Sequence, residues 1–301
     1  MKHRFRLFLC LLLPLAFLLS ACGDDDEGLG SGDTPETTDP KADEEAAFDE
    51  GTTMADLQEA GKIKIGVKYD QPGLGSVNLE SEEPEGFDIE MGKLVAAKLG
   101  IEPGDIEFVE TVSANRETFI ENGTVDIVIA TYTINDERKE VIDFAGPYYV
   151  AGQDLLVAAD DDTINGPDDL AGKRVCAASG STPIERIRTD YPDAEPVEFD
   201  TYTECVDQLS TGQVDAVSTD DIILAGYAAD PNYEGQFRVV GETFSEEPYG
   251  IGLTKGDDEF RDFLNDVLEE SFEDGTWKEA FDATLGTSGV EAPDPPEVDR
   301  Y

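Results

Sequence analysis

Between residues 51 and 285 the spacing of apolar residues changes repeatedly between the two-residue period of a strand and the 3.6-residue period of a helix. Segments 63–67 and 174–178 follow the strand pattern, and segment 87–99 has the apolar face of a helix that ends at a glycine. Segment 125–131 is nearly all apolar, which is typical of a strand buried on both faces. The same criteria predict further strands at 106–111, 155–158, 197–199 and 215–219, and helices at 117–121, 182–188 and 203–209. Residues 259–285 have the spacing of a long amphipathic helix pair broken near Gly275.

Strands that alternate with helices indicate an α/β fold with parallel sheets, and two such series along one chain predict two lobes. In open α/β sheets, ligands bind beyond the carboxyl ends of the strands. The residues that directly follow the predicted strands are therefore the candidates for a binding site.

Three cations and one anion lie at these strand ends. Lys68, Arg116 and Arg138 are the cations, and Asp220 is the anion. A ligand with two carboxylates and one ammonium group would pair with all four charges, which describes glutamate or aspartate. The uncharged candidates at the same strand ends are Ser113, Thr131, Thr133, Ser181, Thr182 and Tyr202.

The N-terminus predicts export and anchoring. Residues 7–19 form an apolar run that follows a basic start and is too short to span a bilayer, as in a signal peptide. The run ends at Leu19-Ser20-Ala21-Cys22, which resembles the bacterial lipobox, although an ordinary signal with a chance cysteine is the alternative. We therefore expect a signal peptide at 1–21 and a lipid on Cys22. The acidic stretch 22–50 predicts a disordered tether, and the Pro-rich segment 286–301 predicts a flexible tail.

Composition excludes several functions. The chain has 301 residues with 69 acids against 21 Lys and Arg, a net charge of −48 that argues against binding to nucleic acid. Its one histidine, His3, lies in the predicted signal peptide. The mature chain then has no imidazole for a Ser-His or Cys-His couple or for a zinc site. We expect no metal, no cofactor and no enzymatic activity.

The number of cysteines in the mature chain also indicates export. Cys10 would leave with the signal peptide and Cys22 would carry lipid, so Cys176 and Cys205 remain. An even pair outside the cytoplasm favours a disulfide. Two buried free thiols are the alternative.

Several motifs together resemble the family 3 extracytoplasmic solute-binding proteins of ABC transporters for polar amino acids, closest to the glutamate-binding lipoproteins of actinobacteria. They lie at 63–75, 86–91, 115–157, 179–183 and 214–227. The resemblance implies a periplasmic-binding-protein-like fold of type II, with a ligand cleft between two lobes joined by two crossing strands. One crossing would lie near Gly152–Leu155 and the return near Tyr249–Gly252. Lobe 1 would then hold 51–152 and 249–285, and lobe 2 would hold 153–248.

The resemblance also implies roles for the candidate residues. Arg138 would bind the ligand α-carboxylate with help from Thr131 and Thr133, and Asp220 would accept from the α-ammonium. The helix start at Ser181 and Thr182 would close on the same carboxylate from lobe 2. Lys68, Ser113 and Arg116 would contact the side-chain carboxylate, and Tyr202 would touch the ligand from lobe 2. Lys68 departs from relatives that carry arginine at this position.

Other roles for these residues remain open. Arg138 could pair with Glu137 or Asp143 on its own helix face. Arg116 could pair with Glu117 or Asp136 at the surface. Asp220 and Asp221 could be a solvated acidic pair, and Ser113 and Thr131 could be ordinary caps.

The function that the resemblance implies is capture of L-glutamate, or aspartate, and delivery to the permease subunits of an ABC importer. The protein would be a monomer, held by lipid at the outer face of the bacterial cell membrane. Binding of glutamine or another polar amino acid is one alternative, and a cyclohexadienyl dehydratase-like enzyme on the same fold is another.

Overall fold

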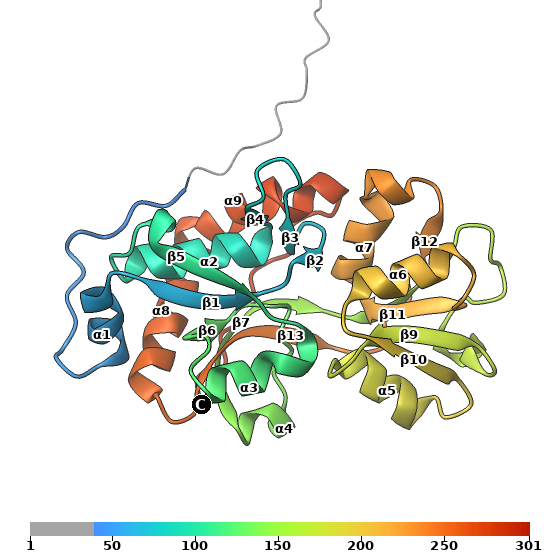
Figure 1. Ribbon diagram of the computed structural model, residues 1–301, viewed down its shortest axis with the longest axis horizontal. Coiled ribbons are helices and arrows are strands. Elements are labelled where there is room, and N and C mark those ends of the chain that lie inside the picture. Colours follow the sequence, from blue (N-terminus) through green and yellow to red (C-terminus); the bar gives the residue numbers. More distant parts are fainter. Residues whose placement is uncertain (1–38) are drawn as a thin grey trace, which may run out of the picture. The chain divides into compact units, whose positions relative to one another are not determined.

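Two separate sheets organise the part of the chain that the structure, a computed structural model, describes, residues 39–301. Each has five strands. The first has the order β5 (Ile106–Glu110), β1 (Ile63–Val67), β6 (Ile127–Val128), β13 (Glu247–Thr254) and β7 (Ile142–Ala151). The second has the order β10 (Glu195–Phe199), β9 (Arg174–Ala178), β11 (Ala216–Asp220), β8 (Gln153–Ala158) and β12 (Phe237–Val239). We call the elements around these sheets lobe 1 and lobe 2 (Figure 1).

Each sheet is mixed, because strands of opposite direction join its parallel part. In lobe 1, β1 pairs parallel with β5 and β6, and β13 pairs antiparallel with β6 and β7. In lobe 2, β9 pairs parallel with β10 and β11, and β8 pairs antiparallel with β11 and β12. The parallel strands were predicted from the sequence. The strand that runs against the others is β13 in lobe 1 and β8 in lobe 2. Each is the first strand after the chain crosses between the lobes, and so enters its sheet from the other direction.

Helices pack on the sheets of both lobes. In lobe 1 these are α1 (Thr53–Ala60), α2 (Phe87–Lys98), α3 (Arg116–Glu121), α4 (Asp136–Lys139), α8 (Asp258–Asp274) and α9 (Thr276–Ala283). In lobe 2 they are α5 (Thr182–Asp190), α6 (Tyr202–Ser210) and α7 (Asp221–Ala229). A small sheet of β2 (Asp70–Gln71), β3 (Gly75–Val77) and β4 (Pro84–Glu85) follows β1. Short 3-10 turns cover Pro103–Asp105, Ser113–Asn115, Pro167–Leu170, Pro231–Tyr233 and Leu285–Ser288.

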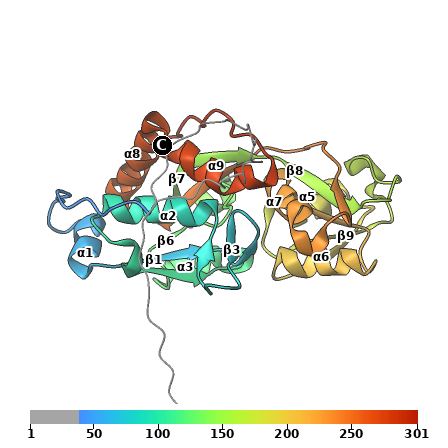
Figure 2. The same cartoon turned by 90° about the horizontal axis from the view of Figure 1, so that it is seen from above.

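The chain passes twice between the lobes. β7 of lobe 1 continues through Gly152 into β8 of lobe 2 (Figure 2). The return runs from β12 into β13, which are labelled in Figure 1. β13 already pairs with β7 at Glu247 and Pro248, opposite Ala151 and Val150. The return predicted near Tyr249–Gly252 therefore lies inside β13, after the chain has re-entered the lobe 1 sheet.

A disulfide ties helix α6 to the lobe 2 sheet. Cys176 in β9 and Cys205 in α6 are bonded, and both are fully buried. The predicted disulfide is confirmed, and the alternative of two free thiols is wrong.

Part of the segment predicted as a tether makes contacts with lobe 1. The Asp43 N–H donates to the Ala97 carbonyl at 2.8 Å. The Phe48 ring meets Phe263 of α8 edge-on at 5.4 Å between centroids. A single aromatic residue in an acidic run thus gives residues 39–50 an anchor. The predicted signal peptide, Cys22 and the first part of the tether lie outside the described residues.

The end of the segment predicted as a flexible tail also makes contacts. Arg300 donates to Asp266 at 2.6 Å and to Glu269 at 2.7 Å, both on α8. The Asp299 N–H donates to the Gly146 carbonyl of β7 at 2.8 Å. The basic residue near the C-terminus therefore pairs with an acidic face of α8. Within residues 39–301 no helix is both long enough and apolar enough to cross a bilayer.

Candidate functional site

A narrow cavity lies where the carboxyl ends of strands from both lobes meet. The volume open to the centre of a water molecule is about 10 Å³, roughly enough for one water. The cavity is therefore too small for an amino acid unless the lobes separate. Its lining contains most of the residues predicted from the sequence, namely Ser113, Arg116, Thr131, Thr133, Ser181, Thr182, Tyr202 and Asp220, together with Pro183 and Ile223.

Arg138 lies beside this cavity and donates to both lobes. It is 7% exposed and follows Asn135, whose side chain caps α4 by accepting from the Arg138 N–H at 2.9 Å. Its guanidinium donates to the Thr133 carbonyl at 2.7 Å and, across the cleft, to the Gly180 carbonyl at 3.2 Å. Glu117 pairs with Nε at 3.2 Å, so neither Glu137 nor Asp143 is the partner. Burial and the nearby charge of Arg116 lower the pKa of Arg138 to about 10.

Arg116 is more deeply buried, at 2% exposure, and is held by backbone carbonyls. It donates to the carbonyls of Ser113, Ala130 and Thr131 at 3.1–3.2 Å. A longer contact of 3.4 Å reaches Gly180 of lobe 2. The surface pairing with Glu117 or Asp136 is therefore wrong, and no ion pair among residues 39–301 includes Arg116.

Lys68 and Ser113 form one unit at the lobe 1 side of the cavity. The Lys68 ammonium donates to the Ser113 hydroxyl at 2.8 Å, and both residues are buried. Burial and the neighbouring Arg116 lower the pKa of Lys68 to about 7. A carboxylate placed here would stabilise the charged form of the amine.

Asp220 presents the one unpaired carboxylate oxygen of the cavity lining. It is 3% exposed at the end of β11, so the idea of a solvated pair with Asp221 is wrong. Oδ2 accepts from the Tyr249 hydroxyl at 2.5 Å, whereas Oδ1 has no hydrogen-bond partner among the described residues. Burial and the carboxylate of Glu247 raise the pKa of Asp220 to about 8. A bound cation would satisfy Oδ1 and lower this pKa.

Two buried side chains near the interlobe passage, Glu247 and Tyr249, support the site, and sequence reasoning missed both. Glu247 is 1% exposed and accepts from the Thr182 hydroxyl at 2.7 Å and from Arg186 at 2.9 Å. It fixes the first residue of α5, whose N-cap is Ser181. Tyr249 fixes Asp220 in the same way from β13. The one signal in the sequence is that Tyr249 belongs to the predicted return to lobe 1, and Glu247 lies two residues before it.

Asp88 in the first turn of α2 is a third supporting residue. Its carboxylate accepts from the Thr131 N–H at 2.9 Å and from the Tyr148 hydroxyl at 2.7 Å. Thr131 has φ 45°, in the left-handed region that residues with a side chain rarely adopt. Asp88 therefore stabilises an unfavourable backbone conformation at the cavity wall. Its own burial raises its pKa to about 6.

Contacts on both sides of the cavity hold the lobes together. Asp70 of lobe 1 accepts from the Tyr202 N–H at the start of α6 at 2.8 Å, and its carbonyl accepts from the Tyr227 hydroxyl at 2.6 Å. A Cβ on Gly226 of α7 would lie 2.4 Å from the Pro72 carbonyl oxygen. The two lobes approach here more closely than a methyl group would allow.

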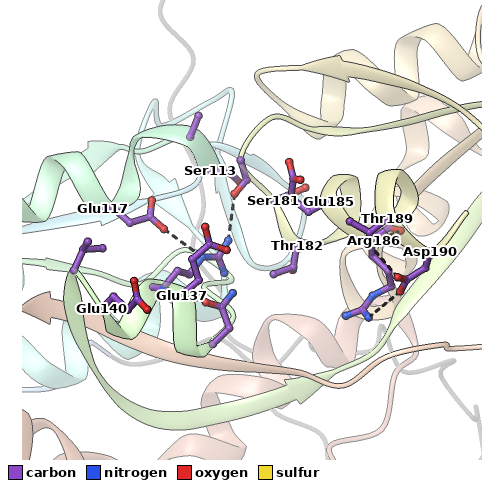
Figure 3. A pocket seen from close by; sticks show the side chains of 15 residues that line it. Ser113, Glu117, Glu137, Glu140, Ser181, Thr182, Glu185, Arg186, Thr189 and Asp190 are labelled. Atoms are coloured by element: carbon purple, nitrogen blue, oxygen red, sulfur yellow. Dashed lines mark hydrogen bonds and ion pairs between the residues drawn. The ribbon is translucent and has the colours of Figure 1, made fainter. Parts of the chain in front are cut away.

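A larger pocket of about 690 Å³ lies between α3 and α4 of lobe 1 and α5 of lobe 2. Figure 3 shows Ser113 and Glu117 on one side of this pocket and Ser181 and Glu185 on the other. Arg138 lines this pocket together with carboxylates from both lobes. Ser113, Ser181 and Thr182 line both the pocket and the narrow cavity. The pocket therefore leads from solvent toward the buried cavity.

Comparisons of the sequence and of the fold with known proteins agree on one family. The family model of bacterial extracellular solute-binding proteins, family 3, matches residues 63–287. The chain is 43% identical to the glutamate-binding protein GluB of Corynebacterium glutamicum, over 77% of this chain and 81% of that one. It is 40% identical to a glutamine-binding protein of Geobacillus stearothermophilus, over 79% and 87% of the two chains. The fold is similar to an ancestral arginine-binding protein bound to glutamine, with a TM-score of 0.70, 35% identity, and coverage of 75% and 98%.

Proposed function

Because the chain belongs to the bacterial extracellular solute-binding proteins of family 3, we propose that it captures L-glutamate and delivers it to the permease of an ABC importer. The family acts outside the cytoplasm and has two α/β lobes, as this chain has. The relatives named above are binding proteins, one of them for glutamate.

The observation that carries the proposal is the charge arrangement around the buried cavity. Arg116 and Arg138 bring two guanidiniums to one end of the cleft, and only Arg138 has a carboxylate partner among the described residues. Asp220 presents a buried carboxylate oxygen with no partner there. An amino acid that carries a second carboxylate would compensate these charges, because buried ionic groups must be paired.

Each residue then has one role. Arg138, with Thr131, Thr133, Ser181 and Thr182, binds the α-carboxylate, since a guanidinium donates two parallel hydrogen bonds to a carboxylate. Asp220 accepts from the α-ammonium. The side-chain carboxylate lies near Lys68, Ser113 and Arg116, and Tyr202 closes the cavity from lobe 2.

Binding requires the lobes to separate and close again. The narrow cavity does not hold an amino acid in this arrangement, and hinged two-lobe proteins close around their ligands. The larger pocket beside Arg138 is the route by which the amino acid enters.

A thermal-shift panel of the twenty amino acids tests the proposal. A ligand that binds only the folded protein stabilises it by ~2.7 kcal/mol at a hundred times its dissociation constant. We expect L-glutamate to give the largest increase in the unfolding midpoint and aspartate a smaller one. The largest increase with glutamine would support the alternative that two of the relatives suggest, and no increase with any acidic amino acid would overturn the proposal.

The remaining parts of the proposal concern the cell. The mature protein is a monomer that starts at a lipid-modified Cys22 and is anchored to the outer face of the membrane. Mass spectrometry of the native protein should find diacylglycerol on Cys22 and no residues 1–21. The protein carries out no covalent step, so incubation with prephenate or arogenate should give no aromatic product.

A further inference from the structure

Tyr132 lies between the two arginines of the candidate site, and nothing in the sequence marks it as functional. The guanidinium carbon of Arg116 is 4.2 Å from the centre of its ring, and that of Arg138 is 5.0 Å away. The residue is fully buried, between Thr131 and Thr133 of the cavity lining. One aromatic ring thus touches both cations of the site.

The two cations have little other compensation. Glu117 pairs with Arg138, whereas the acceptors of Arg116 among the described residues are neutral backbone carbonyls. Like charges held near each other in a buried environment repel strongly. The face of an aromatic ring carries negative charge density and attracts guanidinium groups within about 6 Å.

The ring is fixed in this position by its own neighbours. Phe144 of β7 meets it edge-on at 4.8 Å between centroids. Gly252 of β13 leaves it room, because a Cβ there would lie 2.9 Å from the ring carbon Cε1. The ring therefore cannot turn away from the arginines without repacking the sheet.

The hydroxyl of Tyr132 lies near the Glu117 carboxylate, which pairs with Arg138. It is buried and has no hydrogen-bond partner among residues 39–301. The contact with both guanidiniums is therefore made by the ring face.

We propose that Tyr132 is a positioning residue whose ring holds the guanidiniums of Arg116 and Arg138 ready for the carboxylates of the amino acid. This inference rests on the proposed function. The ring stabilises the pair of cations before the anion arrives, so that binding does not first have to bring them together.

Three variants test the inference: Tyr132→Phe keeps the ring, Tyr132→Leu removes it, and Phe260→Leu removes a buried ring of α8 that touches neither arginine. Calorimetry with L-glutamate should give Tyr132→Phe an affinity within about twofold of the wild type. Tyr132→Leu should bind at least about tenfold more weakly. Phe260→Leu should lose thermal stability and keep its affinity. Wild-type affinity in Tyr132→Leu, or equal weakening in Tyr132→Phe and Tyr132→Leu, would overturn the inference.

Crystal structures of the unliganded Tyr132→Phe and Tyr132→Leu proteins supply a readout that does not depend on the ligand. We expect both guanidiniums to stay in place in Tyr132→Phe and at least one to move in Tyr132→Leu. Unchanged guanidiniums in Tyr132→Leu would contradict the inference. A wild-type protein that binds no acidic amino acid would instead contradict the proposed function, and the crystal structures would still decide the role of the ring.

Discussion

Arg138 of lobe 1 donates a hydrogen bond to the carbonyl oxygen of Gly180 in lobe 2, at 3.2 Å. The acceptor is neutral, and a carboxylate accepts more strongly from a guanidinium than a carbonyl does. An amino acid that enters the cleft can therefore replace the Gly180 carbonyl as the partner of Arg138. In the proposed function, lobe closure and carboxylate recognition therefore use the same donor.

Removing the Arg138 guanidinium should abolish most of the affinity. We expect Arg138→Ala to weaken glutamate binding by ~2–5 kcal/mol, as when one partner of a buried charge pair is lost. Arg174→Ala is a matched control, because Arg174 pairs with Asp215 at the surface of lobe 2 and neither residue lines the cavity. Calorimetry should find wild-type affinity in the control, and wild-type affinity in Arg138→Ala would refute the assigned role.

A methyl group at Gly226 should hold the lobes apart. Its Cβ would lie 2.4 Å from the Pro72 carbonyl, and such overpacking costs ~1–3 kcal/mol. Gly226 lies inside helix α7, where alanine is intrinsically ~1 kcal/mol more favourable than glycine. Gly226→Ala should therefore bind glutamate about tenfold more weakly without loss of thermal stability, and small-angle scattering should show a larger radius of gyration.

The control for this variant is Gly104→Ala. A Cβ at Gly104 meets no atom within 4 Å, and the position has no positive φ. Scattering and affinity should match the wild type. An unchanged radius of gyration in Gly226→Ala would show that the contact with Pro72 does not limit closure.

The contribution of Asp220 to the stability of the unliganded protein should fall as the pH rises toward 8. Burial raises the pKa of Asp220 to about 8, whereas an aspartate in the unfolded chain has a pKa of ~3.9. Between these values the folded state binds one proton more than the unfolded state. The contribution of Asp220 to stability is then greatest at low pH and is lost, by up to ~1.4 kcal/mol per pH unit, as the pH rises through the folded pKa.

Asp220→Asn removes this titration. Thermal unfolding of both proteins should be measured from pH 5 to pH 8. The unfolding midpoint of the variant should rise relative to that of the wild type with each pH unit. Parallel midpoints across that range would mean that the buried carboxylate is not protonated in the folded protein.

Loss of the disulfide should destabilise lobe 2. Cys176 and Cys205 are separated by 29 positions, and cross-links of such loops typically contribute ~2–4 kcal/mol. Urea unfolding of the Cys176→Ser, Cys205→Ser protein should show a loss of this size. Reducing agent should lower the midpoint of the wild type and leave that of the double variant unchanged. A wild-type midpoint in the double variant would contradict a stabilising role.

Local sequence patterns predict a helix or strand correctly where its apolar residues follow one period and its ends carry clear signals. β1 and β9 have the predicted bounds, and the long C-terminal helix pair breaks at Gly275, which has φ 88°. Helix α7 has no such pattern, because Asp221–Ala229 is apolar almost all round and is buried on most sides. The antiparallel pairing of β13 with β7 joins segments about a hundred residues apart and has no local signature.

The residues of the candidate site also differ in whether the sequence could predict them. Arg138 and Asp220 could be predicted because they follow strands at the edge where ligands bind. Asp88, Glu247 and Tyr249 could not, because each acts through hydrogen bonds on residues far away in the sequence. The acceptors of Arg116, which are backbone carbonyls rather than a carboxylate, have no sequence signal at all.

Asp70 accepts from the first N–H of helix α6 but does not line the cavity. When the lobes part, this N–H and the Tyr227 hydroxyl must exchange their partner for water. The lifetime of the closed protein therefore depends in part on a residue that does not touch the amino acid. How tightly the cargo is held thus depends also on contacts between the lobes that the cargo does not touch.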